Sequence, residues 1–275
     1  MDNETDWEVL YHYTSLPGFF RILSSGVIAL CDITKSNDPA EGVYSLQMMK
    51  KAYSELERRE EIDDKTYRRF HKSFFLFSEM ESTFGRLQQT ALSLSVCEPE
   101  LPLALWRAYG DNGCGIALGI SKQKMQEIGK REGFGFKAVQ YYSEKEMLEK
   151  YCEFWKNHIN DNEEALKDAL SEQYFNGYFI KRKENAFERE WRLIYSGLRL
   201  DDYCILSPQV PENMNAYVRR DDLVIYYELS LKEEHILDTV VLGPQCKVTY
   251  NEMKWLLAKY GIHNCGVTHD NTVME

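Results

Sequence analysis

The sequence lacks the short motifs by which proteins usually bind zinc. It contains no Cys-x-x-Cys pair and no two histidines at His-x-x-x-His spacing, which are common spacings of zinc ligands. Cysteine occurs seven times, but always singly, at positions 31, 97, 114, 152, 204, 246 and 265. An odd number of scattered cysteines is typical of a reduced cytoplasmic protein without a disulfide framework. We therefore expect a cytoplasmic location and no metal site.

Long apolar runs and basic blocks are also missing. No stretch reaches the roughly 20 apolar residues that a membrane-spanning helix needs, and the acidic start Met1-Asp2-Asn3-Glu4 differs from a signal peptide. The formal net charge is -11, and the only run of three basic residues is Lys181-Arg182-Lys183. Neutralising nucleic-acid phosphates requires clustered Lys and Arg. We expect no membrane partner, and a protein partner is favoured over nucleic acid, although a local basic groove remains compatible with this charge.

The sequence does contain an alternation of short strand-like and helical segments. β-type runs are expected at residues 9–13, 27–31, 90–96, 114–120, 134–142, 187–196, 203–207, 215–219, 222–229, 236–242 and 266–268. Helical patterns lie between Ser15 and Gly26, after Pro102, and at 40–80, 121–131, 143–183 and 249–260. Neither a repeat nor a low-complexity linker divides the chain. We expect one α+β domain over residues 1–275, with helical elaborations at about 40–80 and 143–183.

Two helix starts carry recognisable capping residues. Thr14 or Ser15 can cap the helix that ends at Gly26, because a side-chain oxygen at this position accepts a bond from a free amide of the first turn. Asn37-Asp38-Pro39 with Glu41 is most simply another N-cap. The alternative is a loop that faces a phosphate or a ribose, but the Asp38 carboxylate would repel a phosphate, so a structural role is favoured.

The most informative segment is Phe187-Glu188-Arg189-Glu190-Trp191-Arg192-Leu193-Ile194, which has the pattern of a strand. Side chains alternate along a strand, so Glu188, Glu190 and Arg192 are expected on one face, with the two carboxylates about 7 Å apart. Such a pair suits an enzyme that stabilises an oxocarbenium-like centre. The simpler interpretation is an exposed charge ladder that Arg192 and Lys183 neutralise, and for an isolated Glu-x-Glu it is the favoured one.

Other polar and aromatic positions are ambiguous when each is taken alone. His12 stands at the end of a strand beside hydroxyl residues and can bind a sugar hydroxyl, although a packed, half-buried histidine is the favoured interpretation. Ser93 and Ser95 share one face of their strand, where they either bind a ligand or allow close packing. Trp106 and Tyr109 lie on one helix face, which usually belongs to the core, but a tyrosine can also stack on a heterocycle such as nicotinamide.

Six short motifs follow one another along the chain: YHYTS at 11–15, SNDPAE at 36–41, SLS at 93–95, WRAYGDNGCGIALG at 106–119, FEREWRLI at 187–194 and VVLGP at 240–244. In content and order they resemble a bacterial family of unknown function, domain-of-unknown-function family 2971. The resemblance spans about Leu10 to Pro244 and leaves residues 121–183 least constrained.

The resemblance implies an ADP-ribosyltransferase-like fold, with a split antiparallel or mixed β-sheet core, flanking helices and a helical insertion. In that superfamily a strand-borne His or Arg, a Ser/Thr or Tyr motif and a late Glu build the NAD pocket. The resemblance therefore implies NAD-contacting residues at His12, Tyr13, Thr14, Ser95, Trp106, Tyr109 and Arg192. His12 would orient a ribose or the nicotinamide region, and either Tyr109 or Ser95 would line the nicotinamide site.

The resemblance also implies a catalytic set of Glu190, Glu188 and His12. Glu190 would bind a hydroxyl of the nicotinamide ribose and stabilise the oxocarbenium as nicotinamide leaves. Glu188 would guide the acceptor nucleophile. The branch of the superfamily that carries Glu-x-Glu usually has an arginine in the first motif, where this chain has His12.

The expected function is thus NAD-dependent ADP-ribosyl transfer to a macromolecule, as in a toxin or an anti-phage defence effector. NAD would be the substrate, and the acceptor remains open. Two alternatives use the same cleft: an NAD glycohydrolase, in which water replaces the acceptor, and a non-catalytic module that binds a nucleotide or a partner. Replacing Glu190 with Gln separates catalysis from simple binding.

Overall fold

The computed structural model describes residues 7–35, 44–82, 90–100, 103–198, 212–219 and 221–273. Two predicted features, the N-cap at Asn37-Asp38-Pro39 and the strand at 203–207, lie outside the described residues. None of the helices in these described ranges is long and apolar enough to cross a membrane.

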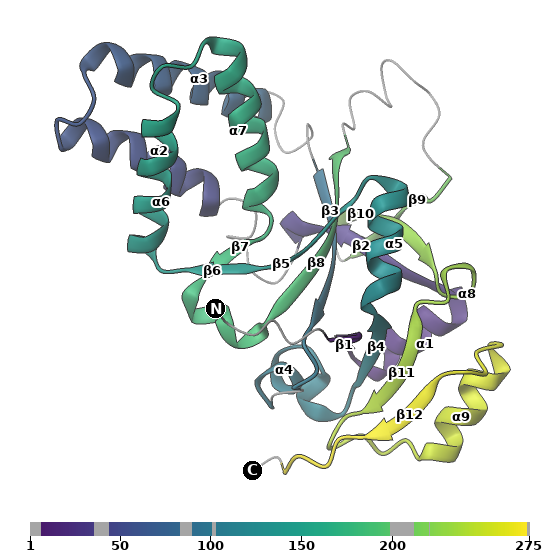
Figure 1. Ribbon diagram of the computed structural model, residues 1–275. Coiled ribbons are helices and arrows are strands. Elements are labelled where there is room, and N and C mark those ends of the chain that lie inside the picture. The colour runs from purple at the N-terminus through teal and green to yellow at the C-terminus, as the bar shows by residue number, and fades with distance from the viewer. Residues whose placement is uncertain are drawn as a thin grey trace.

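The described strands form one large and one small β-sheet (Figure 1). The large sheet has the order β12-β11-β4-β1-β3-β2-β10-β9, and β8 joins β3 to β5. The bounds of its strands are β1 Val9–Thr14, β2 Val27–Asp32, β3 Thr90–Cys97, β4 Ile116–Ser121, β5 Gly135–Ala138, β8 Glu190–Leu198, β9 Met214–Arg219, β10 Asp222–Ser230, β11 Leu237–Leu242 and β12 Gly266–His269. Its strands pair antiparallel apart from β11 with β12, and the small sheet pairs β6 (Gln140–Tyr142) with β7 (Ile180–Arg182) in parallel. The predicted α+β class with a mixed, mostly antiparallel sheet is confirmed.

The large sheet divides at β3. One edge of β3 pairs with β8 over most of its length. The other edge is shared, because among the described residues β1 pairs with it only at Tyr11 and Cys97, and β2 only at Ser93 and the residue before it. Between these two contacts the backbone carbonyl of Ser95 accepts a hydrogen bond from Nδ1 of His12 at 2.9 Å. The sheet is therefore split beside Ser95, and an imidazole stands where a backbone partner would continue the ladder.

The two faces of β3 have different roles. Its apolar side chains Leu92, Leu94 and Val96 pack in the main core with residues of the helices that cover the sheet. Ser93 and Ser95 alternate with them and lie on the opposite face, as their spacing predicted. The helices that pack against the large sheet are α1 Leu16–Ser25, α4 Leu103–Ala108, α5 Lys122–Glu132, α8 Leu231–Glu234 and α9 Tyr250–Lys259.

The predicted caps of the first helix are confirmed. The side chain of Ser15 accepts a bond from the amide of Gly18, and Pro17 lies in the first turn. Gly26 ends α1 with φ of 72°, a left-handed conformation that costs a glycine little. This compact β1–α1 connection places Thr14 and Ser15 at the end of the split.

A second hydrophobic core lies in a bundle of four helices that stands at one end of the molecule (Figure 1). The bundle consists of α2 Tyr44–Arg58, α3 Asp64–Ser82, α6 Glu144–Asn157 and α7 Glu163–Gly177. Its two halves come from the segments expected to be helical at about 40–80 and 143–183. The prediction was too long at its C-terminal end, because the helix ends at Gly177 and residues 180–182 form β7. Two distant stretches of sequence thus complete one core.

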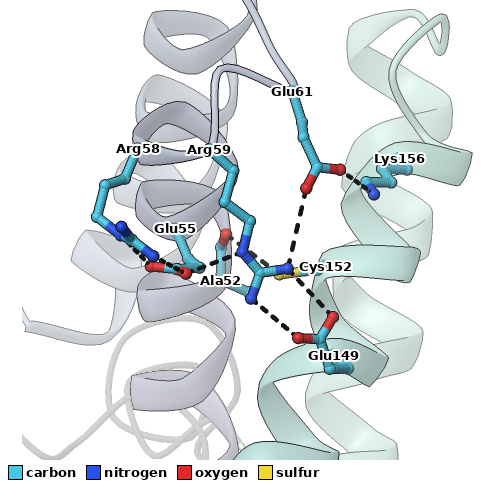
Figure 2. A network of polar contacts seen from close by, with 8 residues as sticks. All are labelled: Ala52, Glu55, Arg58, Arg59, Glu61, Glu149, Cys152 and Lys156. Carbon is cyan, nitrogen blue, oxygen red and sulfur yellow. Dashed lines mark hydrogen bonds and ion pairs between the residues drawn. The ribbon is translucent and has the colours of Figure 1, made fainter.

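Ion pairs join α2 to α6 on the surface of the bundle (Figure 2). Arg59, which directly follows α2, donates to Glu55 of that helix at 2.8 Å and to both carboxylate oxygens of Glu149 at 2.9 and 3.2 Å. Lys156 of α6 pairs with Glu61, which follows α2. Partly exposed pairs of this kind are screened by salt and contribute little net stability. The apolar core beneath them is therefore the main support of the bundle.

Trp155 tests the importance of that core. Its side chain is 0% exposed, its indole N–H donates to the carbonyl of Met49 at 2.9 Å, and its ring packs on Phe70. We expect Trp155→Ala to lower the free energy of unfolding by about 3–5 kcal/mol, because it leaves a large cavity. Trp255→Ala, at a tryptophan on α9 that is 64% exposed, should change it by about 0.5 kcal/mol or less. Urea unfolding followed by circular dichroism measures both, and similar losses in the two variants would contradict this assignment of the core.

Candidate active site

A pocket of about 930 Å³ opens along the split between β1 and β3. The predicted site residues that line it are His12, Tyr13, Thr14, Ser95, Tyr109, Glu188 and Glu190. The other two predicted residues lie behind its wall. Trp106 is buried against Tyr13, with ring centroids 4.9 Å apart, and Arg192 is buried beside Glu190. The structure therefore brings together residues from four separate parts of the sequence.

Glu188 does not stand on the strand that the sequence predicted. It ends the short 3₁₀ helix η3 (Lys183–Glu188), and β8 begins only at Glu190. Arg189 between them has φ of 41°, a left-handed conformation that turns the chain and breaks the expected alternation. Both carboxylates still reach the pocket, Glu188 from the turn and Glu190 from the strand.

A buried cluster of four charges forms one wall of the pocket. Nζ of Lys181 lies 2.6 Å from Glu188 and 2.8 Å from Glu190. Arg192 donates to the two oxygens of Glu190 through Nε at 2.8 Å and Nη2 at 3.1 Å. Glu188, Glu190 and Arg192 are only 5%, 4% and 1% exposed. The exposed charge ladder is therefore wrong, and the two negative charges are balanced by two positive ones away from solvent, as buried ions require.

Lys181 is the site residue that the sequence reasoning missed. Lys183, which was expected to neutralise the glutamates, instead pairs with Glu146 at 3.0 Å on the surface. In the short strand β7 both Ile180 and Lys181 are buried while Arg182 is exposed, and Lys183 already belongs to η3. The only local signal was a lysine next to the apolar Ile180, within a basic run that otherwise seemed exposed.

The environment keeps Glu190 ionised. Burial alone raises the pKa of its carboxyl, but the charges of Arg192 and Lys181 and their hydrogen bonds outweigh this and lower the pKa to about 2. Next to it, the hydroxyl of Tyr109 donates to Glu188 at 2.7 Å. Burial and this bond raise the pKa of Tyr109 well above its usual value, so its hydroxyl stays a donor at neutral pH.

His12 is held in one neutral form. Burial lowers the pKa of its imidazole, and the hydrogen bond to Ser95 opposes the shift only in part. Because a carbonyl oxygen can only accept, Nδ1 carries the proton of the neutral ring and Nε2 keeps a free lone pair. His12 can therefore accept a hydrogen bond from a ligand hydroxyl, which is the chemistry expected of it.

Two buried hydroxyls of the pocket residues are unsatisfied. Tyr13 Oη and Ser93 Oγ have no hydrogen-bond partner among the described residues, although both residues line the pocket. An unsatisfied buried hydroxyl costs about 1–3 kcal/mol, so proteins rarely keep one without use. These two atoms are consistent with a pocket built to bind a polar ligand.

The described residues contain no group of three or more His, Cys, Asp or Glu side chains arranged to hold a metal ion. The two carboxylates of the pocket are instead bridged by the ammonium of Lys181.

Replacing Lys181 should be costly for the fold. Lys181→Met leaves two buried carboxylates without their shared ammonium, and we expect a loss of about 3–5 kcal/mol in the free energy of unfolding. Lys183→Met is the matched control, because it removes only an exposed ion pair and should cost about 0.5 kcal/mol or less. Urea unfolding compares the two, and a larger loss for Lys183→Met would contradict the assignment of the buried bridge to Lys181.

The charge cluster should also make stability depend on pH. The pKa of Glu190 in the folded protein is about 2 against 4.5 for a free side chain, so its ionised form stabilises the fold above about pH 4.5 and this contribution is lost as the pH falls toward 2. We expect the difference in unfolding free energy between the wild type and Glu190→Gln to shrink between about pH 6 and about pH 3. Glu153→Gln, at an exposed position of α6, should differ little from the wild type in unfolding free energy at either pH. A constant Glu190→Gln difference would show that its carboxylate is not the titrating group.

The comparison with protein families bears on the central part of the chain. Residues 105–193 match a family described as "Protein of unknown function (DUF2971)". No curated protein and no solved structure matches the chain. The matched segment contains Tyr109, Lys181, Glu188 and Glu190, whereas His12 lies outside it. The similarity to this family of unknown function therefore covers residues 105–193, the part of the chain that carries the charge cluster.

Proposed function

We propose that the protein uses NAD to transfer ADP-ribose to a macromolecule, with the pocket at the split as its active site. The observation that carries the proposal is the convergence of two buried carboxylates, a neutral histidine and a tyrosine hydroxyl on this pocket. Its volume of about 930 Å³ lies near the upper end of the range of about 300–1,000 Å³ for ligand sites. A pocket of this size suits a ligand as large as a dinucleotide.

Glu190 is the carboxylate best placed to act on the ribose. As the bond between nicotinamide and ribose breaks, nicotinamide leaves with the bonding electrons and positive charge develops on the sugar ring. A carboxylate held in place before the reaction stabilises that charge without reorganisation. Arg192 and Lys181 hold Glu190 in position and ionised, which supports this role.

Glu188 is assigned to the acceptor. It accepts one hydrogen bond from Lys181 and one from Tyr109, and a carboxylate has about four acceptor positions. It therefore keeps capacity for a further donor, such as the hydroxyl or amine of an acceptor side chain. Its position at the end of η3, where the chain turns, separates it from the strand that carries Glu190.

The opposite side of the pocket would position the substrate. Nε2 of His12 can accept a ribose hydroxyl, and the hydroxyl of Tyr13, which has no partner among the described residues, can bond to a polar atom of the ligand. Thr14 follows them on the same strand and lines the pocket. The exposed rings of Tyr109 and Phe187 offer apolar surface against which a planar base or nicotinamide can pack.

Nucleotide binding without catalysis is the second candidate. Two cations balance the two carboxylates of the cluster, so the wall carries no excess negative charge with which to stabilise a developing cation. This balance favours a site that binds the nucleotide and leaves it intact. NAD hydrolysis, with water as the acceptor, differs from transfer only in the last step and is an outcome of the same test.

Nicotinamide release from NAD tests the proposal. We expect the wild type to release nicotinamide, faster when cell lysate supplies acceptors, and Glu190→Gln to lower the rate by about 100-fold or more. Tyr109→Phe keeps the aromatic ring but removes the donor to Glu188, and should lower transfer to the acceptor more than hydrolysis. Glu153→Gln on α6, outside the pocket, is the matched control and should retain the wild-type rate.

The outcomes separate the candidates. Labelled acceptor identifies a transferase, and release that is independent of lysate identifies a hydrolase. Binding of intact NAD without release would move the assignment to the nucleotide-binding module. If the wild type neither binds NAD nor releases nicotinamide, and thermal unfolding shows that it is folded, the proposal is overturned. Because Glu190→Gln also disturbs a buried ion pair, its rate is interpreted only at temperatures below its own melting transition.

A further inference from the structure

The end of the pocket away from the charge cluster is lined by basic side chains. Arg21 comes from α1, Lys35 from the end of the short helix η1 (Ile33–Lys35), and Arg219 from the end of β9. These three residues come from different segments of the sequence, and none of them belongs to the sequence motifs described above. In a protein with a formal net charge of -11, their convergence on one pocket wall is the local basic groove that the overall composition left open.

The nearby carboxylates offset only part of this charge. Lys35 is paired with Asp222 at 2.5 Å, so its charge is balanced. The carboxylate of Asp32 is engaged by the amide and hydroxyl of Thr34. Asp222 is the cross-strand neighbour of Arg219, whose charge helps to lower the pKa of its carboxyl. Among the described residues, however, no ion pair joins Asp222 or Asp32 to Arg21 or Arg219.

The two arginines keep their donors available. Arg219 donates through Nη2 to the backbone carbonyl of Lys35 at 2.8 Å, which carries no charge. The guanidinium of Arg21 makes no hydrogen bond or ion pair with the residues that the structure describes. Both arginines line the pocket together with Tyr217. Burial raises the pKa of Tyr217, and the positive charges of Arg219 and Arg21 oppose the rise. Two guanidinium groups that form no ion pair with a carboxylate of the described residues thus line the same pocket.

One continuous sheet face connects this basic end with the charge cluster. The strands that form it lie side by side in the order β8, β3, β2, β10, β9. At a spacing of about 4.8 Å between neighbouring strands, β8 and β9 are about 19 Å apart. Ser93 of β3 lies between them, paired with Cys31 of β2, and its buried hydroxyl has no partner among the described residues. The pocket floor is therefore too long for one sugar ring and carries an unsatisfied polar atom along its length.

We propose that Arg21 and Arg219 bind the phosphate groups of a nucleoside diphosphate moiety whose sugar lies toward the charge cluster. The phosphate site itself does not depend on the proposed function. Only the identity of the group that the diphosphate carries toward the charge cluster rests on it. Guanidinium groups suit phosphate because they donate two parallel hydrogen bonds to its oxygens and stay charged at all relevant pH values. Two of them at the far end of a polar floor match a ligand with phosphates at a distance from its reactive sugar. A longer nucleic acid is disfavoured, because the remainder of the protein surface is acidic overall.

Calorimetric titration with ADP, with adenosine as the ligand that lacks phosphates, tests the inference. We expect ADP to bind at least about tenfold more tightly than adenosine, and Arg21→Gln and Arg219→Gln each to weaken ADP binding by about tenfold or more without affecting adenosine. Arg58→Gln, which removes an exposed arginine of the helical bundle paired with Glu55, is the matched control and should bind ADP as the wild type does. Raising the salt concentration should weaken ADP binding in the wild type and in Arg58→Gln more than in the two pocket variants.

Several results would overturn the inference: no ADP binding, equal binding of ADP and adenosine, or ADP binding indifferent to both pocket substitutions. Binding of a single-stranded oligonucleotide but not of ADP would also overturn it. Its failure is distinguishable from failure of the proposed function. Arginine-dependent ADP binding without nicotinamide release would support the phosphate site and contradict the enzyme. Nicotinamide release with an unchanged KM for NAD in both arginine variants would support the enzyme and contradict the phosphate site.

Discussion

The ammonium of Lys181 between two buried carboxylates is the interaction on which the rest of the site depends. Because buried charges must be compensated within the protein, this contact fixes β7, η3 and the start of β8 against one another. It also links the two halves of the molecule. α7 runs into β7, and β6 precedes α6, so the small sheet stands between the helical bundle and the pocket. The hydroxyl of Tyr141 in β6 accepts a hydrogen bond from the backbone amide of Glu190 at 2.9 Å, which is a second link between the small sheet and the start of β8.

Sequence reasoning was most successful where local rules decide the structure. The caps of α1, the two faces of β3 and the helical character of both bundle segments follow from short-range patterns, and the structure confirms them. The motifs also contain half of the residues that line the pocket, because strand ends and turns carry polar residues that the core cannot accept. What these patterns could not give is which segments meet. The bundle core joins stretches about 100 residues apart, and no periodicity indicates that they share one interior.

The errors at the charge cluster have one physical origin. The sequence reasoning extended a strand through Arg189, but this residue adopts a left-handed conformation that its side chain does not signal. Because the chain turns there, Glu188 bonds to Lys181 and Tyr109 and not to the expected cations. Neutralisation was then assigned to Lys183, whereas β7 brings Lys181 to both glutamates. In each case tertiary packing overrode a rule that holds only within a regular strand.

The split between β1 and β3 has a consequence for how the width of the pocket can change. A continuous ladder of backbone hydrogen bonds would force neighbouring strands to share a common twist. Here one paired position and one imidazole span the junction, so each half of the sheet can keep its own curvature. The width of the pocket opening thus depends on the relative position of the two halves of the sheet. Substitutions at the split alone can widen or narrow it while both hydrophobic cores stay intact.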